Sequence, residues 1–155
     1  TLMSPGKTFN TAGLNTAFAV IPDASRRRAY AAARKHAMPY PNALGYTAAL
    51  AAYRHGEPWR QQLLCVLRRN AQRVHEVVSR ELPGVAMPRI EATYLAWLDA
   101  RGLDVGDPYL HFRRHGVALS DGKPFGAPGF VRLNFGCPGS LLEEGLSRLR
   151  GAVAQ

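Results

Sequence analysis

The chain has 155 residues, 46% hydrophobic and 20% charged, which fits one globular domain, or a small domain with a remnant of another, and excludes a disordered protein. Its formal net charge is +9, and 17 of its 20 basic residues are arginines spread from Arg26 to Arg150. Because they do not alternate with the aromatic residues of an RNA-binding sheet, we expect a solvated basic surface and no nucleic-acid partner.

The sequence gives no sign of a membrane segment, a metal site or a disulfide framework. No apolar run reaches the ~18 residues of a membrane span, and the N-terminus lacks a signal-peptide layout, so we expect no membrane partner and a cytoplasmic location. Cys65 and Cys137 are typical of incidental thiols, although one bridge between them stays open. His111 and His115 have the spacing of a zinc pair but no third ligand, so we expect no metal.

The first part of the chain predicts a loop, a short strand and three helices with recognisable start and stop signals. In chain order these are a loop over 1–10, a strand over 18–21, a helix from Asp23 or Ser25 to Arg34, a helix from Asn42 that stops at Gly56, and a long helix over 59–82. The long helix carries one apolar stripe: Trp59, Leu63, Val66, Leu67, Val74, Val77 and Leu82.

The remainder alternates strands and helices, which predicts an α/β layer packed on its helices. Its expected elements are a strand over 93–98, a helix from Asp107 to His115, strands over 117–119 and 130–135, and a helix from Ser140 to about Val153. Ser140 and Glu143 have the spacing of a capping box for that last helix.

The segment Ser4-Pro5-Gly6-Lys7-Thr8 allows three chemical interpretations. A P-loop would need a glycine where Thr1 stands, and a penicillin-binding Ser-x-x-Lys would need a companion Lys-Thr-Gly that is missing. The third is the lysine of a pyridoxal-phosphate (PLP) site, in which a serine three residues upstream helps to hold the phosphate.

Four segments decide among these interpretations by resemblance. SPGKTFNTAGL at 4–14 is similar to the lysine segment of the cystathionine β-lyase branch of class I/II aminotransferases, the C–S lyases of fold type I. AAYRHGEPW at 51–59, ATYLAWLD at 92–99 and FVRLNFGCP at 130–138 resemble further segments of that branch, in the same order. Gly6 departs from the pattern, because many relatives have serine or threonine there.

The resemblance implies an α/β fold in two parts. Residues 1–57 would be a C-terminal remnant of the large PLP-binding domain, and residues 58–155 the interdomain helix with the small C-terminal α/β domain. The N-terminal half of the parent enzyme would be missing, so we expect the 155 residues alone to be catalytically inactive. The parent enzyme would be a homodimer.

The resemblance also implies the site. Lys7 would form the Schiff base with PLP and act as general base, Ser4 would contact the cofactor phosphate, and Arg132 would bind the carboxylate of an amino-acid substrate. The plain alternatives are an exposed loop lysine, a turn-forming serine and an edge-strand arginine. Tyr94 and Trp97 are expected to pack in the sheet.

The implied function is a PLP-dependent C–S β-lyase that acts on cystathionine or related cysteine S-conjugates and releases thiol, pyruvate and ammonia. Two alternatives remain open. One is a PLP-dependent aminotransferase, which shares the first half of the reaction, and the other is a non-catalytic fragment that folds without cofactor.

Overall fold

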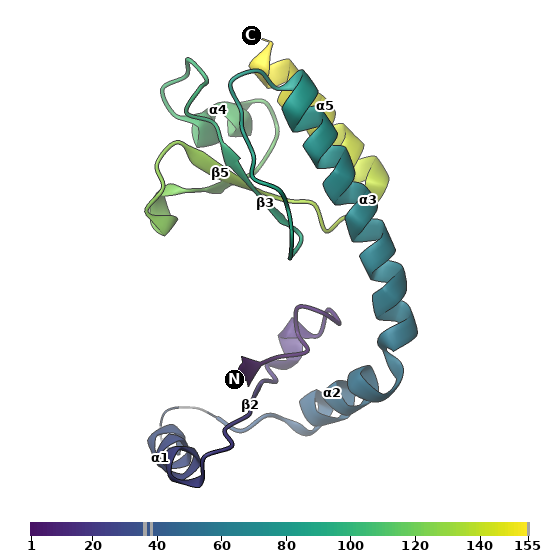
Figure 1. Cartoon of the computed structure of the whole chain (residues 1–155), viewed down its shortest axis with the longest axis vertical. Helices are drawn as coiled ribbons and strands as arrows, with labels where there is room; N and C mark the ends of the chain where they lie inside the picture. The colour runs from purple at the N-terminus through teal and green to yellow at the C-terminus, as the bar shows by residue number, and fades with distance from the viewer. Residues whose placement is uncertain (36, 38, 155) are drawn as a thin grey trace. The chain divides into compact units, whose positions relative to one another are not determined.

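The computed structural model describes residues 1–35, 37 and 39–154, which form two compact units (Figure 1). The first is Thr1–Leu63, and the second runs from Leu64 to the end of the described chain. The division expected from the sequence lies between residues 57 and 58, and the assignment of the two parts to a large and a small domain stays a prediction.

The first unit consists of short elements. They are β1 (Leu2–Met3), the 3-10 helix η1 (Ala12–Leu14), β2 (Phe18–Ala19), α1 (Ala24–Arg34) and α2 (Ala43–His55). Both helices begin as predicted, because Asp23 accepts a hydrogen bond from Arg26 N at 2.7 Å and Asn42 accepts one from Gly45 N at 2.8 Å. The strand predicted over 18–21 is only two residues long and pairs antiparallel with β1, which the sequence did not predict.

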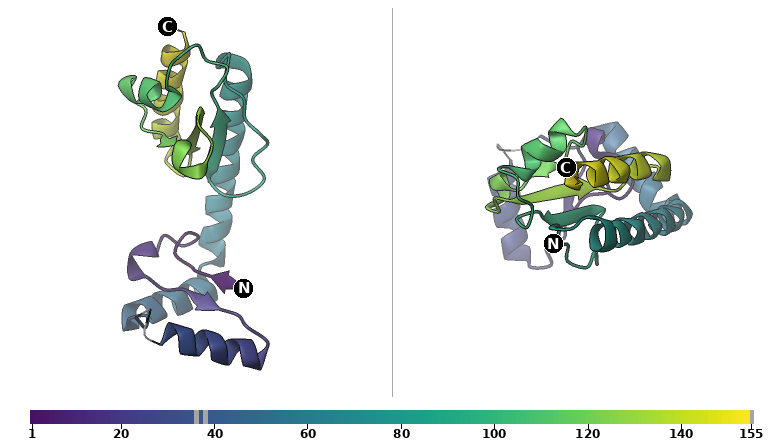
Figure 2. Two further views of the ribbon diagram at one scale, coloured as in Figure 1. Left: turned by 90° about the vertical axis from the view of Figure 1, so that its left-hand side faces the viewer. Right: turned by 90° about the horizontal axis from the view of Figure 1, so that it is seen from above.

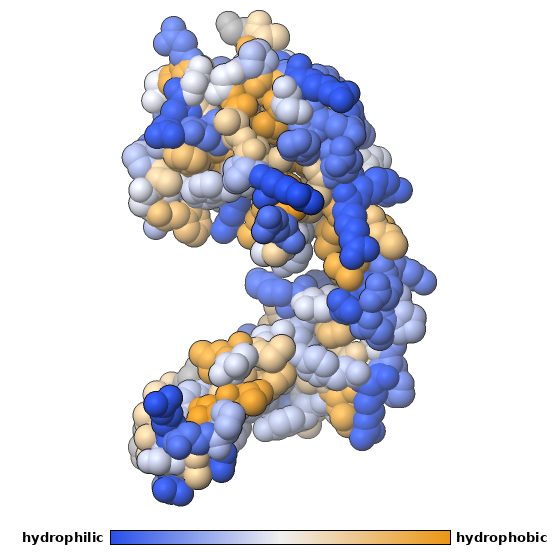
Figure 3. Space-filling model, in the orientation of Figure 1, coloured by the Kyte–Doolittle hydropathy of each residue, from blue (hydrophilic) through white to orange (hydrophobic). Residues whose placement is uncertain are grey.

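Large apolar side chains remain exposed in the first unit, where apolar patches interrupt the polar surface in Figure 3. Helix α1 has no buried residue, and α2 buries only Gly45. The exposed set comprises Leu2, Met3, Phe18, Val20, Tyr30, Tyr40, Leu44, Tyr46, Leu50, Tyr53 and Trp59. An apolar surface of this kind is typical of a face that another protein surface covers.

The second unit is an α/β layer around a three-stranded sheet. The long helix α3 (Glu57–Glu81) begins in the first unit and is followed by β3 (Leu95–Asp99), α4 (Pro108–Arg114), β4 (Ser120–Asp121), the 3-10 helix η2 (Lys123–Phe125), β5 (Phe130–Asn134) and α5 (Gly139–Val153). The strand order is β3-β5-β4, and both pairings are antiparallel. This mixed architecture confirms the predicted α/β class.

The two long strands each bury one face, as their period of two requires. Ala96 and Leu98 of β3 and Val131 and Leu133 of β5 are buried, and α3 and α5 lie side by side in the same core (Figures 1 and 2). The intervening side chains, Trp97 and Arg132 among them, lie on the opposite face of the sheet.

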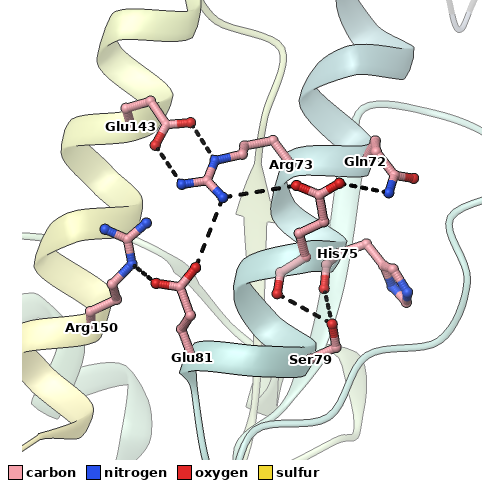
Figure 4. A network of polar contacts seen from close by, with 8 residues as sticks. Gln72, Arg73, His75, Ser79, Glu81, Glu143 and Arg150 are labelled. Atoms are coloured by element: carbon pink, nitrogen blue, oxygen red, sulfur yellow. Dashed lines mark hydrogen bonds and ion pairs between the residues drawn. The ribbon is translucent and has the colours of Figure 1, made fainter.

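Ion pairs join α3 to α5 at the edge of this core (Figure 4). Arg73 donates to both carboxylate oxygens of Glu143, at 2.7 and 3.0 Å, and Glu81 lies 2.7 Å from Arg150 Nε. The hydrogen bonds from Arg73 hold the pKa of Glu143 below its ordinary value. Because all four side chains are partly exposed, these ion pairs contribute little to the stability of the fold.

Two local predictions are wrong. The strand expected over 117–119 is instead Ser120–Asp121, because backbone pairing with β5 begins only at Ser120, while Val117 and Leu119 are buried outside the sheet. The capping box is also absent: α5 starts one residue earlier, after Pro138, with no side-chain cap, and the carboxylate of Glu143 binds Arg73.

None of the described helices is long and apolar enough to cross a membrane. No three histidine, cysteine, aspartate or glutamate side chains gather as a metal site within residues 1–35, 37 and 39–154. Cys65 and Cys137 are both free, so the bridge that the sequence left open is not formed. His111 and His115 instead bind backbone carbonyl oxygens, those of Ala152 and His111 respectively.

Candidate active site

Lys7 lies on a tight turn. Hydrogen bonds fix the backbone of the turn, whereas the side-chain amine of Lys7 is free. Phe9 N donates to Pro5 O at 2.9 Å, and Thr11 N donates to Gly6 O at 3.1 Å. Pro5 and Gly6 are buried, whereas Lys7 is exposed and makes no hydrogen bond or ion pair with any described residue. The chain thus holds a primary amine at a defined place and leaves it available to another group.

Gly6 suits this turn for a steric reason. A Cβ at position 6 would lie 3.1 Å from Ala12 Cα and 3.2 Å from Ser4 Oγ, closer than most Cβ contacts. A serine or threonine here would therefore push against the backbone of η1. The departure from the family pattern at this position matches the close packing of this chain's turn.

The turn is anchored to α2 and the start of α3 through the ring of Phe9. Its centre lies 5.9 Å from the ring of Tyr53 and 6.1 Å from that of Trp59. Gly56 makes room for it, since a Cβ there would lie 2.5 Å from the Phe9 ring. Two segments that carried the resemblance, 4–14 and 51–59, are therefore in direct contact.

Ser4 uses its hydroxyl to shape the same turn. Its Oγ donates to Thr16 O at 2.8 Å and accepts from Gly6 N at 3.1 Å. A phosphate oxygen is an acceptor only, so contact with it would require the hydroxyl hydrogen to leave Thr16 O. The geometry supports the turn-forming role directly.

Arg132 lies in β5, opposite Trp97 of β3 and Ser120 of β4. Its guanidinium donates through Nη2 to Ser120 Oγ at 3.3 Å, and its Cζ lies 4.9 Å from the centre of the Phe125 ring. No carboxylate of the described chain forms an ion pair with it, in contrast to Arg101, which binds Asp99 in the same sheet. A half-buried guanidinium with unused donors is ready to bind an anion.

Asn70 holds the end of the Arg132 strand in place. It is the buried polar residue of the core, 2% exposed, and its side-chain amide donates to Phe135 O at 3.0 Å and to Cys137 O at 2.9 Å. Both bonds tie α3 to the segment that follows β5. The sequence carried a signal for this role, because position 70 falls on the buried face shared by Val74 and Val77.

Asn70→Ala is expected to lower the free energy of unfolding by about 1–3 kcal/mol, because two carbonyl oxygens lose their partner. Gln72→Ala, at an exposed position on the same helix, is the control and is expected to change it by less than about 0.5 kcal/mol. Urea unfolding followed by circular dichroism measures both. Equal stability of the two variants would contradict the anchoring role.

Lys7 and Ser4 share one turn of the first unit, and Arg132 lies in the second unit. Sequence reasoning did not find Asn70, Ser120 or Phe125. Ser120 was placed outside any strand, and Phe125 lies in a segment that reads only as a Gly/Pro-rich loop. Trp97 packs against the rings of Phe125 and Phe130, as expected for a residue of the sheet.

Comparison with known proteins extends over nearly all of these elements. Residues 1–149 match the family described as aminotransferase class I and II. The chain belongs to this family. The family match and the similarity to cystathionine β-lyases confirm the resemblance drawn from the four sequence segments.

Individual members of the aminotransferase family support the same branch. The cystathionine beta-lyase PatB of Bacillus subtilis (strain 168) is 36% identical over 160 residues, which cover 99% of this chain and 41% of PatB. The crystal structure of OvoB matches 99% of this chain and 40% of its own, with a TM-score of 0.96 and 47% identity. The PLP-bound C-S lyase of Staphylococcus hominis, complexed with L-cycloserine, matches with a TM-score of 0.86 and 30% identity over 98% of this chain and 38% of its own. The chain thus spans about two fifths of the length of the relatives it matches.

Proposed function

We propose that the protein that carries these residues is a PLP-dependent C–S β-lyase acting on cystathionine or a related cysteine S-conjugate. The observation that carries the proposal is the free amine of Lys7 on a turn anchored from both sides. The similarity to a cystathionine beta-lyase and to a PLP-bound C-S lyase supports the reaction class.

The residues present fit the cofactor. PLP needs a primary amine that can bond to its aldehyde, and Lys7 is exposed with no competing partner in the described chain. Ser4 would contact the phosphate once its hydroxyl turns away from Thr16 O. When bound, the cofactor ring supplies an acceptor for the electron pair released as the substrate Cα–H bond breaks.

The chain's own residues would bind and orient the substrate and move its proton. Arg132 would hold the α-carboxylate by two parallel charge-assisted hydrogen bonds, which fix the direction in which the Cα–H bond points. Once the substrate has displaced its amine from the cofactor, Lys7 would take the Cα proton as general base. Departure of the thiolate from the β-carbon would complete the elimination, with hydrolysis to pyruvate and ammonia.

In the catalytically competent protein, Arg132→Lys is expected to lower kcat/KM about tenfold or more, because it keeps the charge but loses the two-pronged geometry. The cofactor absorbance should stay unchanged, since the contact is made to the substrate. Arg113→Lys, on the exposed side of α4, is the control and should have native kinetics. Native kinetics for Arg132→Lys would disprove the carboxylate role.

The experiment that tests the reaction type uses L-cystathionine as substrate. A lyase is expected to release pyruvate without any added keto acid, whereas an aminotransferase needs a keto-acid acceptor for each further turnover. Assays for pyruvate and for glutamate, each run with and without 2-oxoglutarate, measure the difference. Formation of glutamate that depends on 2-oxoglutarate, without release of pyruvate, would favour the aminotransferase, the alternative that the family membership supports.

The proposal includes a homodimer and a cytoplasmic location. The exposed apolar side chains of the first unit support the homodimer, because such a surface is typically covered by another protein surface. We also retain the expected cytoplasmic location. A fragment that folds without cofactor would be recognised as a protein that stays colourless after incubation with PLP and removal of the free PLP.

A further inference from the structure

The guanidinium of Arg132 is restrained from two directions by residues outside its own strand. Ser120 Oγ accepts the hydrogen bond from Nη2 at 3.3 Å, which holds one edge of the planar group. The Cζ of Arg132 lies over the ring of Phe125, 4.9 Å from the ring centre. The other nitrogen donors have no carboxylate partner in the part of the chain that the structure describes.

The Phe125 ring is itself held by an aromatic stack. Trp97 meets it edge-on, with ring centres 5.8 Å apart and an interplanar angle of 90°. Trp97 also stacks on Phe130 at 5.7 Å and 16°, and the guanidinium of Arg101 lies over Phe130 at 4.8 Å. The ring is therefore fixed even though Phe125 is 57% exposed.

The backbone that carries Phe125 is equally constrained. Phe125 N donates to Gly122 O at 2.9 Å within η2, and a Cβ at position 122 would lie 2.6 Å from Phe130 O. Only glycine fits there. Lys123 forms an ion pair with Asp107, the N-cap residue of α4, so η2 is tied to a helix as well as to the sheet.

We propose that Phe125 and Ser120 are positioning residues that orient the Arg132 guanidinium for a substrate carboxylate. This inference rests on the proposed function, in which Arg132 binds the carboxylate. Two parallel hydrogen bonds to a carboxylate require one orientation of the guanidinium plane. An unrestrained arginine side chain would lose conformational freedom when it adopts that orientation on binding, whereas a side chain that is already oriented loses less. The Ser120 hydroxyl would hold the Nη2 edge of the guanidinium, and the Phe125 ring would orient its plane.

The first test measures steady-state kinetics of the competent enzyme with an amino-acid substrate. Phe125→Leu and Ser120→Ala are each expected to raise KM about three- to tenfold, while kcat changes by less than about twofold. Phe125→Tyr and Ser120→Thr keep the ring and the hydroxyl and should restore native KM. Ser79→Ala, which removes an exposed hydroxyl bound to helix backbone in α3, is the matched control and should leave KM unchanged.

The second test asks whether the effect passes through Arg132. In an Arg132→Lys background, Phe125→Leu should raise KM by less than about twofold, because the guanidinium that it positions is gone. A further measurement needs neither cofactor nor turnover. The heteronuclear NOE of the Arg132 Nε–H group in the 155-residue chain should fall in Phe125→Leu and return in Phe125→Tyr.

The outcomes separate this inference from the function on which it rests. Native kinetics for Arg132→Lys would overturn the carboxylate role and the positioning role together. An impaired Arg132→Lys beside native KM in Phe125→Leu and Ser120→Ala would overturn the positioning role alone. Equal effects of Phe125→Leu in both backgrounds would show that the ring acts independently of Arg132, which also overturns it.

Discussion

Lys7→Ala is expected to lower the turnover of the competent enzyme by about a thousandfold or more, because both the attachment of the cofactor and the transfer of the Cα proton depend on this amine. The fold should be unchanged, since the Lys7 side chain is exposed and makes no hydrogen bond or ion pair with any described residue. The visible absorbance of the cofactor bound to protein, and its loss on borohydride treatment, measure attachment separately from turnover.

Two variants show whether the amine itself is required. Lys7→Arg keeps a positive charge at the same place, but a guanidinium remains protonated and cannot attack an aldehyde, so this variant should be as inactive as Lys7→Ala. Lys35→Ala, which removes another exposed lysine at the end of α1, should keep full activity. Substantial elimination activity in Lys7→Ala would disprove the assignment of Lys7.

Phe135→Ala is expected to lower the free energy of unfolding by about 3–5 kcal/mol, the largest stability loss predicted for this chain. The ring is fully buried in the core between the sheet and the helices α3 and α5. Its removal leaves a cavity that the surrounding strands cannot close. The backbone of Phe135 is held in place, because its N–H donates a hydrogen bond to Tyr94 O and its carbonyl oxygen accepts one from the Asn70 amide. Urea unfolding followed by circular dichroism measures the loss.

Leu141→Ala is the matched control for the core variant. It also removes a large apolar side chain, but Leu141 lies in the first turn of α5 and is 57% exposed. We expect a change below about 0.5 kcal/mol. Similar losses for the two variants would mean that Phe135 does not belong to the core.

The helices were predictable from the sequence because their signals are local. Asp23, Asn42 and Asp107 cap the helices that the sequence places after them, and Gly56 ends α2 as expected. The capping box at Ser140 and Glu143 failed because a partner 70 residues away, Arg73, takes the carboxylate. Local patterns do not contain such competition.

Residues of the candidate site could be proposed from the sequence only where a motif contains them. Lys7, Ser4 and Arg132 follow from segments that resemble a family, whereas Phe125 and Ser120 become visible only when η2 and β4 are placed beside β5. The two-residue strand β4 has no periodicity that a sequence could reveal, since its identity depends on backbone pairing with Arg132 and Val131.

The alternation of side chains along β5 places core packing on one face of the strand and the candidate ligand-binding residues on the other. Val131 and Leu133 face the core, while Phe130 and Arg132 face the other side of the sheet. Substitutions on that second side can retune ligand preference with little effect on folding, and substitutions on the first side can do the reverse. A library randomised at positions 97, 120 and 125, with Arg132 kept, would therefore explore new amino-acid substrates while most of its members still fold.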